Sequence, residues 1–435
     1  MKEPVLHYLW KFKKLQRQHF YSVDKQAIEI IHPGYHNTNA GPDFLNARIN
    51  INGIEWNGHV EIHVNSSEWE KHRHQFDEAY NNVILHIVYT CDQPVFTHSG
   101  IELIQAEIKD LVNENDIKNA VAFIENKNEI ACLGQLNQVD PISIRLQKER
   151  AFFSRLEYRY ENTKLQLAKT KNDWEAVFYQ LLARAFGTNI NQYAFERLAE
   201  ILPLSILQKE GYTALRTEAI IFHYSGLLKN TTSDYALELK ELAKQVSIKY
   251  PIEPLNAQEW KFSTMHANNF PTVRIAQFAN LIYNQKNFFS KLIESKNYLQ
   301  LKELFYGKAS AYWDNHYQFE KPAKNIAIKY ISESFCHKLI INAAVPILFT
   351  YGKYSQNQEL IERCIDLLES IPAEQNNVVD TYKKAGLIVK SAFDSQALIE
   401  LKNSFCNQKK CLTCGIGSSI INKVNEAQNS YSLSL

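Results

Sequence analysis

The pattern of hydrophobic and polar positions divides the chain at about residue 110. Before this point, apolar and polar residues alternate with a period of two over residues 27–32, 44–51 and 59–64, which predicts three strands. Residues 4–18 have helical spacing instead. Residues 82–89, NVILHIVY, form a nearly unbroken apolar run, which is typical of a strand buried on both faces.

Turn signals connect these predicted elements. Asn52-Gly53 lies between the second and third strands and is the dipeptide that most favours a two-residue hairpin turn. The polar segment 67–80 favours a helix, and a last strand is expected within residues 101–108. The order helix, three strands, helix, strand predicts an α/β domain, built as a small mixed sheet with flanking helices.

Beyond the α/β domain, the apolar period becomes that of helices, which predicts a large, mostly α-helical region. Prolines separate successive segments of this kind, which are residues 142–171, 173–186, 192–201, 214–227, 234–249, 274–284, 325–349, 357–370 and 396–405. We therefore divide the chain into an α/β domain (1–115), a connector (116–140), a helical region of one or two subdomains (141–405), a cysteine motif (406–424) and a polar tail (425–435).

Charge and composition narrow the environment. The 48 basic and 47 acidic residues nearly cancel, so a nucleic-acid partner would need a local basic patch. The N-terminus lacks the pattern of a signal peptide, and no window approaches the roughly 18 apolar residues of a membrane span. We expect a cytoplasmic protein with no membrane partner, in which the seven cysteines are reduced.

The candidate chemistry lies on the second and third strands. Asp43, in GPDF, opens the second strand, and GHVEIHV places Glu61 and His63 two residues apart on one face of the third. Two carboxylates from neighbouring strands can hold Mg²⁺ or Mn²⁺, and an imidazole beside them can orient or deprotonate a water for hydrolysis of a phosphodiester. Asp43, Glu61 and His63 are the candidate catalytic residues, with Asp43 and Glu61 as the metal ligands. The alternative is a capping aspartate and two solvated strand residues.

The register of the hairpin sets a condition on this site. If Asn52-Gly53 forms a two-residue turn, Ile51 faces Ile54 and strict pairing sends Asp43 to the face opposite Glu61. The two acids converge only with a one-residue bulge, expected at Asn57-Gly58, or with an Asp43 that precedes the ladder.

The segment after the third strand, EWEKHRHQFDEAYNN, offers His72, His74, Asp77 and Tyr80 as substrate-binding residues. In a continuous helix Asp77 and Tyr80 share a face, whereas His72 and His74 do not. An ordinary polar surface helix is the alternative. Three residues of the loop before Asp43 are further candidates to line the site: His32, Asn37 and Asn39.

The α/β domain resembles the PD-(D/E)XK nuclease superfamily, on the order of its elements, the Pro-Asp before the second strand and the Glu-x-basic pattern on the third. This resemblance implies a restriction-endonuclease-like fold and metal-dependent cleavage of nucleic acid. The lysine of that motif is His63 here, and a neutral imidazole lacks the permanent charge of an ammonium. Two functions stay open: a metal-dependent nuclease or phosphodiesterase, or a catalytically inactive nuclease-like protein that binds nucleic acid or acts as a scaffold.

Three cysteines near the C-terminus form a C-x4-C-x2-C pattern, Cys406, Cys411 and Cys414. In a reducing compartment such thiolates can hold Zn²⁺ or an iron–sulfur cluster, with Cys132 as the candidate fourth ligand. Some nucleases of the superfamily named above carry a [4Fe–4S] cluster on C-terminal cysteines. A redox or sensor protein is therefore a third functional class, and unligated reduced thiols are the alternative.

Phrases along the whole chain, among them GPDFLNARI, GHVEIHVNSSEW, NFPTVRIAQFANL and NAAVPILFTYGKY, are similar to an uncharacterised bacterial family, domain of unknown function 2851. The resemblance is expected to run from end to end, and it implies no established activity. The sequence contains no phosphate-binding loop, dinucleotide-binding turn or nucleophile elbow that would indicate another class of enzyme.

Overall fold

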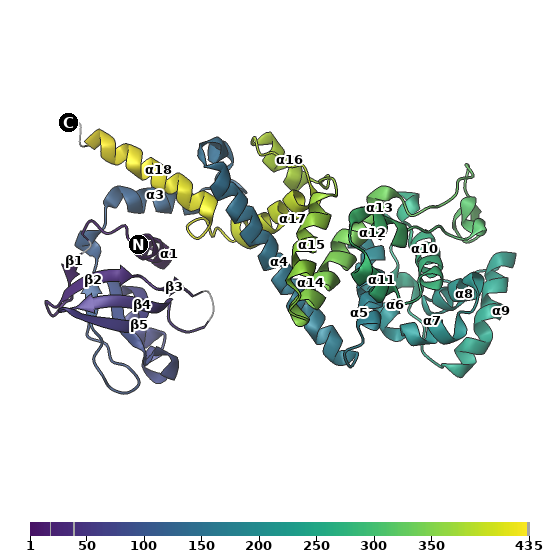
Figure 1. Ribbon diagram of the computed structural model, residues 1–435, viewed down its shortest axis with the longest axis horizontal. Coiled ribbons are helices and arrows are strands. Elements are labelled where there is room, and N and C mark those ends of the chain that lie inside the picture. The colour runs from purple at the N-terminus through teal and green to yellow at the C-terminus, as the bar shows by residue number, and fades with distance from the viewer. Residues whose placement is uncertain (18, 38–39, 433–435) are drawn as a thin grey trace. The chain divides into compact units, whose positions relative to one another are not determined.

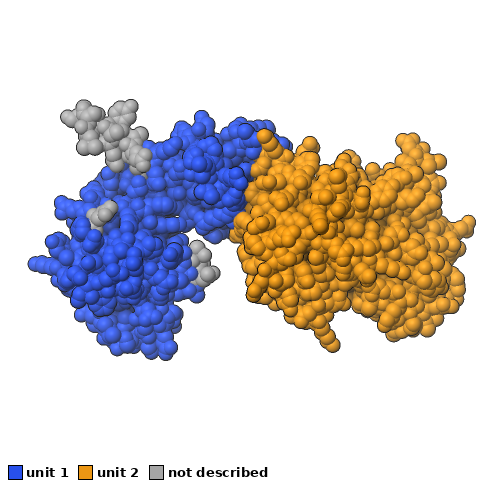
Figure 2. Space-filling view, viewed as in Figure 1, with its two compact units in different colours: residues 1–151, 380–388, 398–435 blue, residues 152–379, 389–397 orange. Residues whose placement is uncertain are grey.

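The computed structural model describes residues 1–17, 19–37 and 40–432. Internal contacts divide the chain into two compact units, coloured separately in Figure 2. Unit 1 consists of residues 1–151, 380–388 and 398–435, and unit 2 of residues 152–379 and 389–397. The chain thus returns to unit 1 twice, at residue 380 and, after a last segment of unit 2, at residue 398.

Unit 1 is built on a seven-stranded mixed sheet (Figure 1). Its strands are β1 (His19–Tyr21), β2 (Ala27–His32), β3 (Tyr35–His36), β4 (Phe44–Ile51), β5 (Ile54–Asn65), β6 (Val83–Thr90) and β7 (Gln105–Glu107). The spatial order is β1-β2-β4-β5-β6-β7, and β3 pairs with β4. The pairs from β1 to β5 are antiparallel, whereas β6 runs parallel to β5 and to β7. The predicted mixed sheet with helices is confirmed.

Helices cover this sheet and complete its core. The helices that lie wholly in unit 1 are α1 (Glu3–Lys11), α2 (Glu68–Lys71), α3 (Glu114–Ile124) and α18 (Gly415–Ser432). Helix α1 packs on β5 and α3, and α18 packs on α3. Apolar residues of α1, the sheet, α3 and the C-terminal segment form one core, which includes Leu9, Ile62, Ala120, Leu412 and Ile421.

Unit 2 is almost entirely helical, as the pattern predicted. Its own helices are α5 (Trp174–Phe186), α6 (Thr188–Ile201), α7 (Leu204–Glu210), α8 (Ala214–Tyr224), α9 (Asp234–Lys249), α10 (Pro271–Asn284), α11 (Phe288–Glu294), α12 (Tyr298–Leu304), α13 (Glu333–Leu339), α14 (Val345–Tyr354) and α15 (Gln358–Glu369). Residues of α4 (Pro141–Lys169), α16 (Asn377–Lys384) and α17 (Ala392–Leu401) belong in part to each unit. A two-stranded sheet of β8 (His316–Gln318) and β9 (Lys321–Pro322) completes the unit.

Outside the candidate site, three predicted elements differ most from the structure. The helix expected over 325–349 begins only at Glu333, where the Ser332 hydroxyl accepts the Phe335 N–H as an N-cap. The last strand within 101–108 shortens to β7, with an isolated bridge between Phe96 and Glu102 before it. The predicted polar tail is helical as far as Ser432, in α18, and residues 433–435 lie outside the described part of the chain.

One helical stretch is more apolar than the sequence analysis allowed. Among the described residues, 333–354 is long and apolar enough to cross a membrane by length and composition alone. Within its most apolar window, 78% of the residues are buried inside the protein. The stretch packs in the core of unit 2 through residues such as Leu339, Ile347 and Leu348, as a core helix of this composition does.

Candidate metal centre

A bulge in β4 determines where Asp43 lies. Ala47 pairs with Gly58, as the two-residue turn predicted, but Phe44 pairs with Val60, so β4 holds one residue more than β5 over this interval. Asn46 adopts a left-handed conformation (φ 55°), which asparagine tolerates, and its N–H donates to His59 Nδ1 (3.2 Å).

The prediction of a bulge at Asn57-Gly58 is therefore wrong, because the extra residue lies in β4. Gly58 has another role, because a Cβ there would lie 2.4 Å from Ile84 Cγ2 and 2.6 Å from the Asn82 carbonyl oxygen. Because Gly58 has no side chain, the backbone at Asn82 and the side chain of Ile84 can pack directly against β5. Asp43 precedes β4 directly, and with the extra residue in β4 it lies beside Glu61.

Backbone hydrogen bonds lock the two carboxylates together. The Asp43 N–H donates to Glu61 Oε2 (3.0 Å), and the Ile62 N–H donates to Asp43 Oδ2 (2.9 Å). The loop before Asp43 is held by Asn37, whose amide nitrogen donates to the Pro42 carbonyl (3.0 Å). Each acid thus keeps at least one carboxylate oxygen in a fixed position.

Imidazoles from three elements surround the two acids. His7 on α1 places Nε2 3.2 Å from Asp43 Oδ2 and 3.7 Å from Glu3 Oε1. Glu61 Oε1 lies 3.5 Å from His63 Nε2 and 3.3 Å from His74 Nε2. Two sets of three ligand atoms each lie mutually within 4.8 Å: those of Glu3, His7 and Asp43, and those of His63, His72 and His74.

The segment between β5 and β6 is not the single helix that the sequence predicted. It consists of α2 and two short 3₁₀ turns, His74–Phe76 and Glu78–Tyr80, because Arg73 adopts a left-handed conformation (φ 64°). This break lets His72 and His74 lie on the same side: His72 Nδ1 is 3.2 Å from His63 Nε2, and the ring of His74 stacks on Tyr80 with centroids 3.9 Å apart.

Other sequence candidates lie outside this cluster. Asp77 is exposed, and its side chain accepts the Ala79 N–H (2.9 Å) as a cap. His32 Nδ1 accepts the Gly34 N–H (3.1 Å). Asn39 lies outside the described residues.

The sequence analysis missed three residues of the cluster, Glu3, His7 and His86. Glu3 and His7 are separated by four positions on α1, a spacing that places them on one face and was a usable signal. His86 is a polar residue in the middle of the apolar run of β6 and is fully buried, which is also a signal.

His86 orients His63. His86 Nε2 lies 2.9 Å from His63 Nδ1, and His86 Nδ1 lies 3.3 Å from the side-chain amide of Gln105. The Gln105 amide nitrogen donates to His86 Nδ1, so His86 donates from Nε2 to His63 Nδ1 and the ring proton of neutral His63 lies on Nε2. His63 is thus held in one orientation, with its Nε2 3.2 Å from His72 Nδ1.

Burial and crowding of like groups shift the pKa values of the cluster. Burial, followed by the charge of Asp43, raises the pKa of Glu61 to about 9. Burial, followed by the neighbouring His74 and His72, lowers the pKa of His63 to about 3. Burial also lowers the pKa of His7, but the adjacent Asp43 carboxylate outweighs this effect, so that this pKa is raised. The carboxyl group of Glu61 is thus protonated at neutral pH unless a cation is bound.

The geometry of two ring nitrogens tests whether a cation fits. Among the described residues, His7 Nε2 and His74 Nε2 are buried and have no hydrogen-bond partner, although each lies within 3.3 Å of a carboxylate oxygen. Ligands at right angles around an octahedral cation, each about 2.1 Å from it, are about 3 Å apart. Each of these imidazole nitrogens lies at this distance from a carboxylate oxygen without hydrogen-bond geometry. The two atoms of each pair are therefore placed as ligands of one cation would be.

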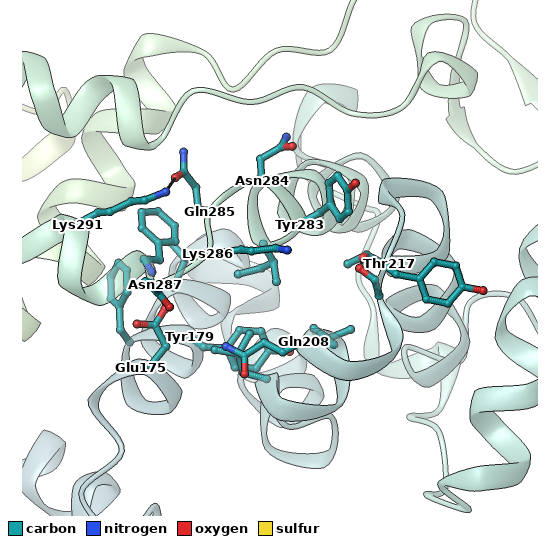
Figure 3. Close-up of a pocket in the computed structure, with 18 residues that line it drawn as sticks. Glu175, Tyr179, Gln208, Thr217, Tyr283, Asn284, Gln285, Lys286, Asn287 and Lys291 are labelled. Carbon is teal, nitrogen blue, oxygen red and sulfur yellow. Dashed lines mark hydrogen bonds between the residues drawn. The ribbon is translucent and has the colours of Figure 1, made fainter.

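A cavity of about 800 Å³ lies elsewhere, within unit 2 (Figure 3). None of the site residues predicted from the sequence lines it. Its polar groups serve local structure: the Glu175 carboxylate accepts the N–H groups of Phe288 and Phe289, and Lys291 donates to Gln285. The predicted chemistry is therefore not in this cavity.

The fold and the cluster define a protein with a mixed α/β unit that carries histidines and carboxylates around its sheet, and a second, helical unit. The chain belongs to the family described as protein of unknown function DUF2851, which matches residues 3–377. The match ends before the C-terminal cysteines, so the expected end-to-end resemblance is shorter than predicted. No curated protein and no solved structure matches the chain.

Proposed function

We propose that unit 1 is a metal-dependent nuclease or phosphodiesterase that acts on nucleic acid. The observation that carries the proposal is the convergence of Asp43 and Glu61 on buried imidazole nitrogens that lack hydrogen-bond partners among the described residues. A divalent cation bound there would polarise a phosphoryl oxygen and lower the pKa of a bound water.

The donor set favours Mn²⁺ over Mg²⁺. Magnesium prefers an all-oxygen environment, whereas imidazole nitrogens suit transition metals. The contacts support Asp43 with His7 and Glu3 as one set of ligands, and Glu61 with His74 as a neighbouring pair. Because its pKa is lowered to about 3, His63 is a poor proton acceptor. Its role in the proposal is therefore to orient a bound water through its Nε2–H.

The order of elements supports nucleic acid as the substrate class. Helix α1, the antiparallel β2, β4 and β5, the helical turns after β5 and the parallel β6 follow the order on which the PD-(D/E)XK resemblance rests. Asp43 precedes the second of these strands and Glu61 lies on the third. The proposal of nuclease-like chemistry rests on this combination of order and acids.

One observation favours the second candidate, a nuclease-like protein without catalysis. The position of the motif lysine is held by His63, which is 1% exposed and carries no charge at neutral pH. Such a protein would bind nucleic acid, or serve as a scaffold, without cleaving it.

Cleavage assays distinguish the two candidates. The full chain is incubated with Mn²⁺ and with single- and double-stranded DNA and RNA, beside the Asp43→Asn and Glu61→Gln variants. Glu55→Gln is the matched control, because Glu55 lies on the same strand as Glu61 but is exposed. We expect cleavage by the wild type and by Glu55→Gln only. Equal cleavage in all four samples, or none in any, would refute catalysis at this site; Mn²⁺-dependent nucleic-acid binding without cleavage would support the second candidate.

A further inference from the structure

Four cysteines from two distant parts of the sequence belong to unit 1. Cys132 lies at the start of a 3₁₀ turn, Leu133–Gln138, while Cys406, Cys411 and Cys414 precede α18. Cys411 and Cys414 are buried, and Cys132 and Cys406 are half-buried. All four are free thiols.

Hydrogen bonds hold the two segments against each other. Lys409 Nζ donates to the carbonyl oxygens of Asn126 (2.9 Å) and Asn128 (2.6 Å), and Lys402 forms an ion pair with Glu129. The residues just before Cys132 are thus fixed to the segment that carries the other three cysteines.

The four thiols are electrostatic neighbours. Burial raises the pKa of Cys132, and the nearby Cys406, Cys414 and Cys411 raise it further. Burial and Cys406 likewise raise the pKa of Cys411 and of Cys414. Cys406 thus acts on each of the other three thiols, which shows that the four lie near one another in unit 1.

The surroundings supply what thiolate ligands need. The N–H groups of Gly417 and Ile416, at the start of α18, hydrogen-bond to Cys414, and the Tyr382 hydroxyl lies 3.4 Å from Cys406 Sγ. The positive charges of Lys409 and Lys402 lower the pKa of Cys406, because they stabilise its thiolate form. Such donors and charges are the outer-shell contacts that tune metal–sulfur centres.

Close packing fixes the turn between the cysteines. A Cβ on Gly417 would lie 2.2 Å from the Cys411 carbonyl oxygen, so only glycine allows the first turn of α18 to approach Cys411 this closely. Arg150 donates to the Thr413 carbonyl (2.8 Å), and Gln147 accepts the Gly415 N–H (2.8 Å). These contacts fix the backbone of the turn that carries Cys411 and Cys414.

The spacing of the sulfur atoms selects the kind of metal centre. A tetrahedral Zn²⁺ with Zn–S distances of about 2.3 Å needs sulfur atoms about 3.8 Å apart. Two sets of three ligand atoms lie mutually within 4.8 Å in the described part of the chain, and both consist of histidines and carboxylates. The four cysteine sulfur atoms belong to neither set. A centre with several metal and sulfide atoms keeps its thiolate ligands farther apart than a single zinc ion does.

We propose that Cys132, Cys406, Cys411 and Cys414 ligate an iron–sulfur cluster that fastens the C-terminal segment to unit 1. Four cysteine thiolates are the usual ligand set of such clusters. The cluster shares no ligand with the proposed hydrolytic site. Its role is structural: it joins the residue 125–132 loop to the start of α18.

Anaerobic reconstitution of the full chain with iron and sulfide tests the proposal. We expect equal amounts of iron and acid-labile sulfide, broad visible charge-transfer absorption, and the Mössbauer spectrum of a thiolate-ligated cluster in the wild type. The Cys132→Ser and Cys411→Ser variants should lose the absorption, whereas Cys91→Ser, a half-buried cysteine of the same unit, should keep it.

The wild-type spectra decide the matter even if a variant fails to fold. Zinc without iron or sulfide, or no bound metal, would overturn the assignment. So would unchanged cluster content in folded Cys132→Ser and Cys411→Ser variants. Asp43→Asn should retain the cluster, which separates this proposal from the hydrolytic one.

Discussion

The affinity of unit 1 for Mn²⁺ should rise steeply with pH, because the cation must displace the proton of Glu61. The pKa of this carboxyl group is raised to about 9, first by burial and then by Asp43. At pH 7 the group is therefore two pH units below its pKa, and each unit corresponds to about 1.4 kcal/mol. Deprotonation costs about 3 kcal/mol at pH 7 and little above pH 9.

The expected result is an apparent Kd for Mn²⁺ that falls about tenfold per pH unit between pH 7 and pH 9, a total of about 100-fold, and then levels off. His7, whose pKa is also raised, contributes a further dependence of the same sign. Titration calorimetry in buffers with different ionisation enthalpies measures both the Kd and the number of protons released.

Two variants make this prediction specific. Glu61→Gln keeps the shape of the side chain but has no proton to lose, so binding should weaken and its steep pH dependence should diminish. The exposed Glu55→Gln on the same strand should behave as the wild type. A wild-type Kd that is constant from pH 7 to pH 9 would show that Glu61 is not a ligand and would refute the reasoning.

Three further predictions concern single positions. His86→Phe should weaken Mn²⁺ binding by about 10- to 100-fold with unit 1 still folded, since it removes the group that orients His63; calorimetry with circular dichroism as the fold control measures this. Gly58→Ala should destabilise unit 1 by about 1–3 kcal/mol, because the added Cβ overpacks against Ile84 and the Asn82 carbonyl. Gly53→Ala, where a Cβ meets nothing within 4 Å, should destabilise it by about 1–2 kcal/mol through the positive φ alone. Hydrogen exchange in β5 compares the two variants, and a smaller effect at Gly58 would contradict this account. Burial raises the pKa of Glu218 in the folded protein. The protonated side chain therefore stabilises unit 2 fully below the pKa that Glu218 has in the unfolded chain, and this stabilisation is lost as the pH rises through the pKa of the folded protein. Glu218→Gln should remove this pH dependence of stability, which thermal unfolding from pH 4 to pH 8 measures.

The local patterns predicted the strands well but not where the site residues converge. The bounds of β2 and β4 and the Ile51–Ile54 turn agree with the structure, because alternation and the Asn-Gly signal act within a few residues. The bulge at Asn46 was misplaced, because a glycine was taken as the signal for it. Gly58 is instead required by the close approach of Ile84 in β6, a contact that sequence spacing does not predict.

The same distinction explains the candidate site. Glu61 and His63 share a face because a strand alternates, and the sequence alone establishes this. His72 and His74 meet only because Arg73 leaves the helical conformation, which the helical pattern of the segment did not indicate. His7 joins them because α1 packs on β5, a long-range contact. The pairing of acids was thus predictable in principle, whereas the set of imidazoles depended on tertiary packing.

The return of the chain to unit 1 connects the two proposed centres physically. Leu412 and Ile421 belong to the same apolar core as Leu6 and Leu9 of α1, and the Tyr8 hydroxyl donates to Asn422 Oδ1 (2.6 Å). The helix that presents His7 to Asp43 is therefore supported by α18, and α18 begins at the cysteines. A cluster that fastens this segment would help to hold α1 in place, so the cysteines can contribute to the geometry of the hydrolytic site without touching a substrate.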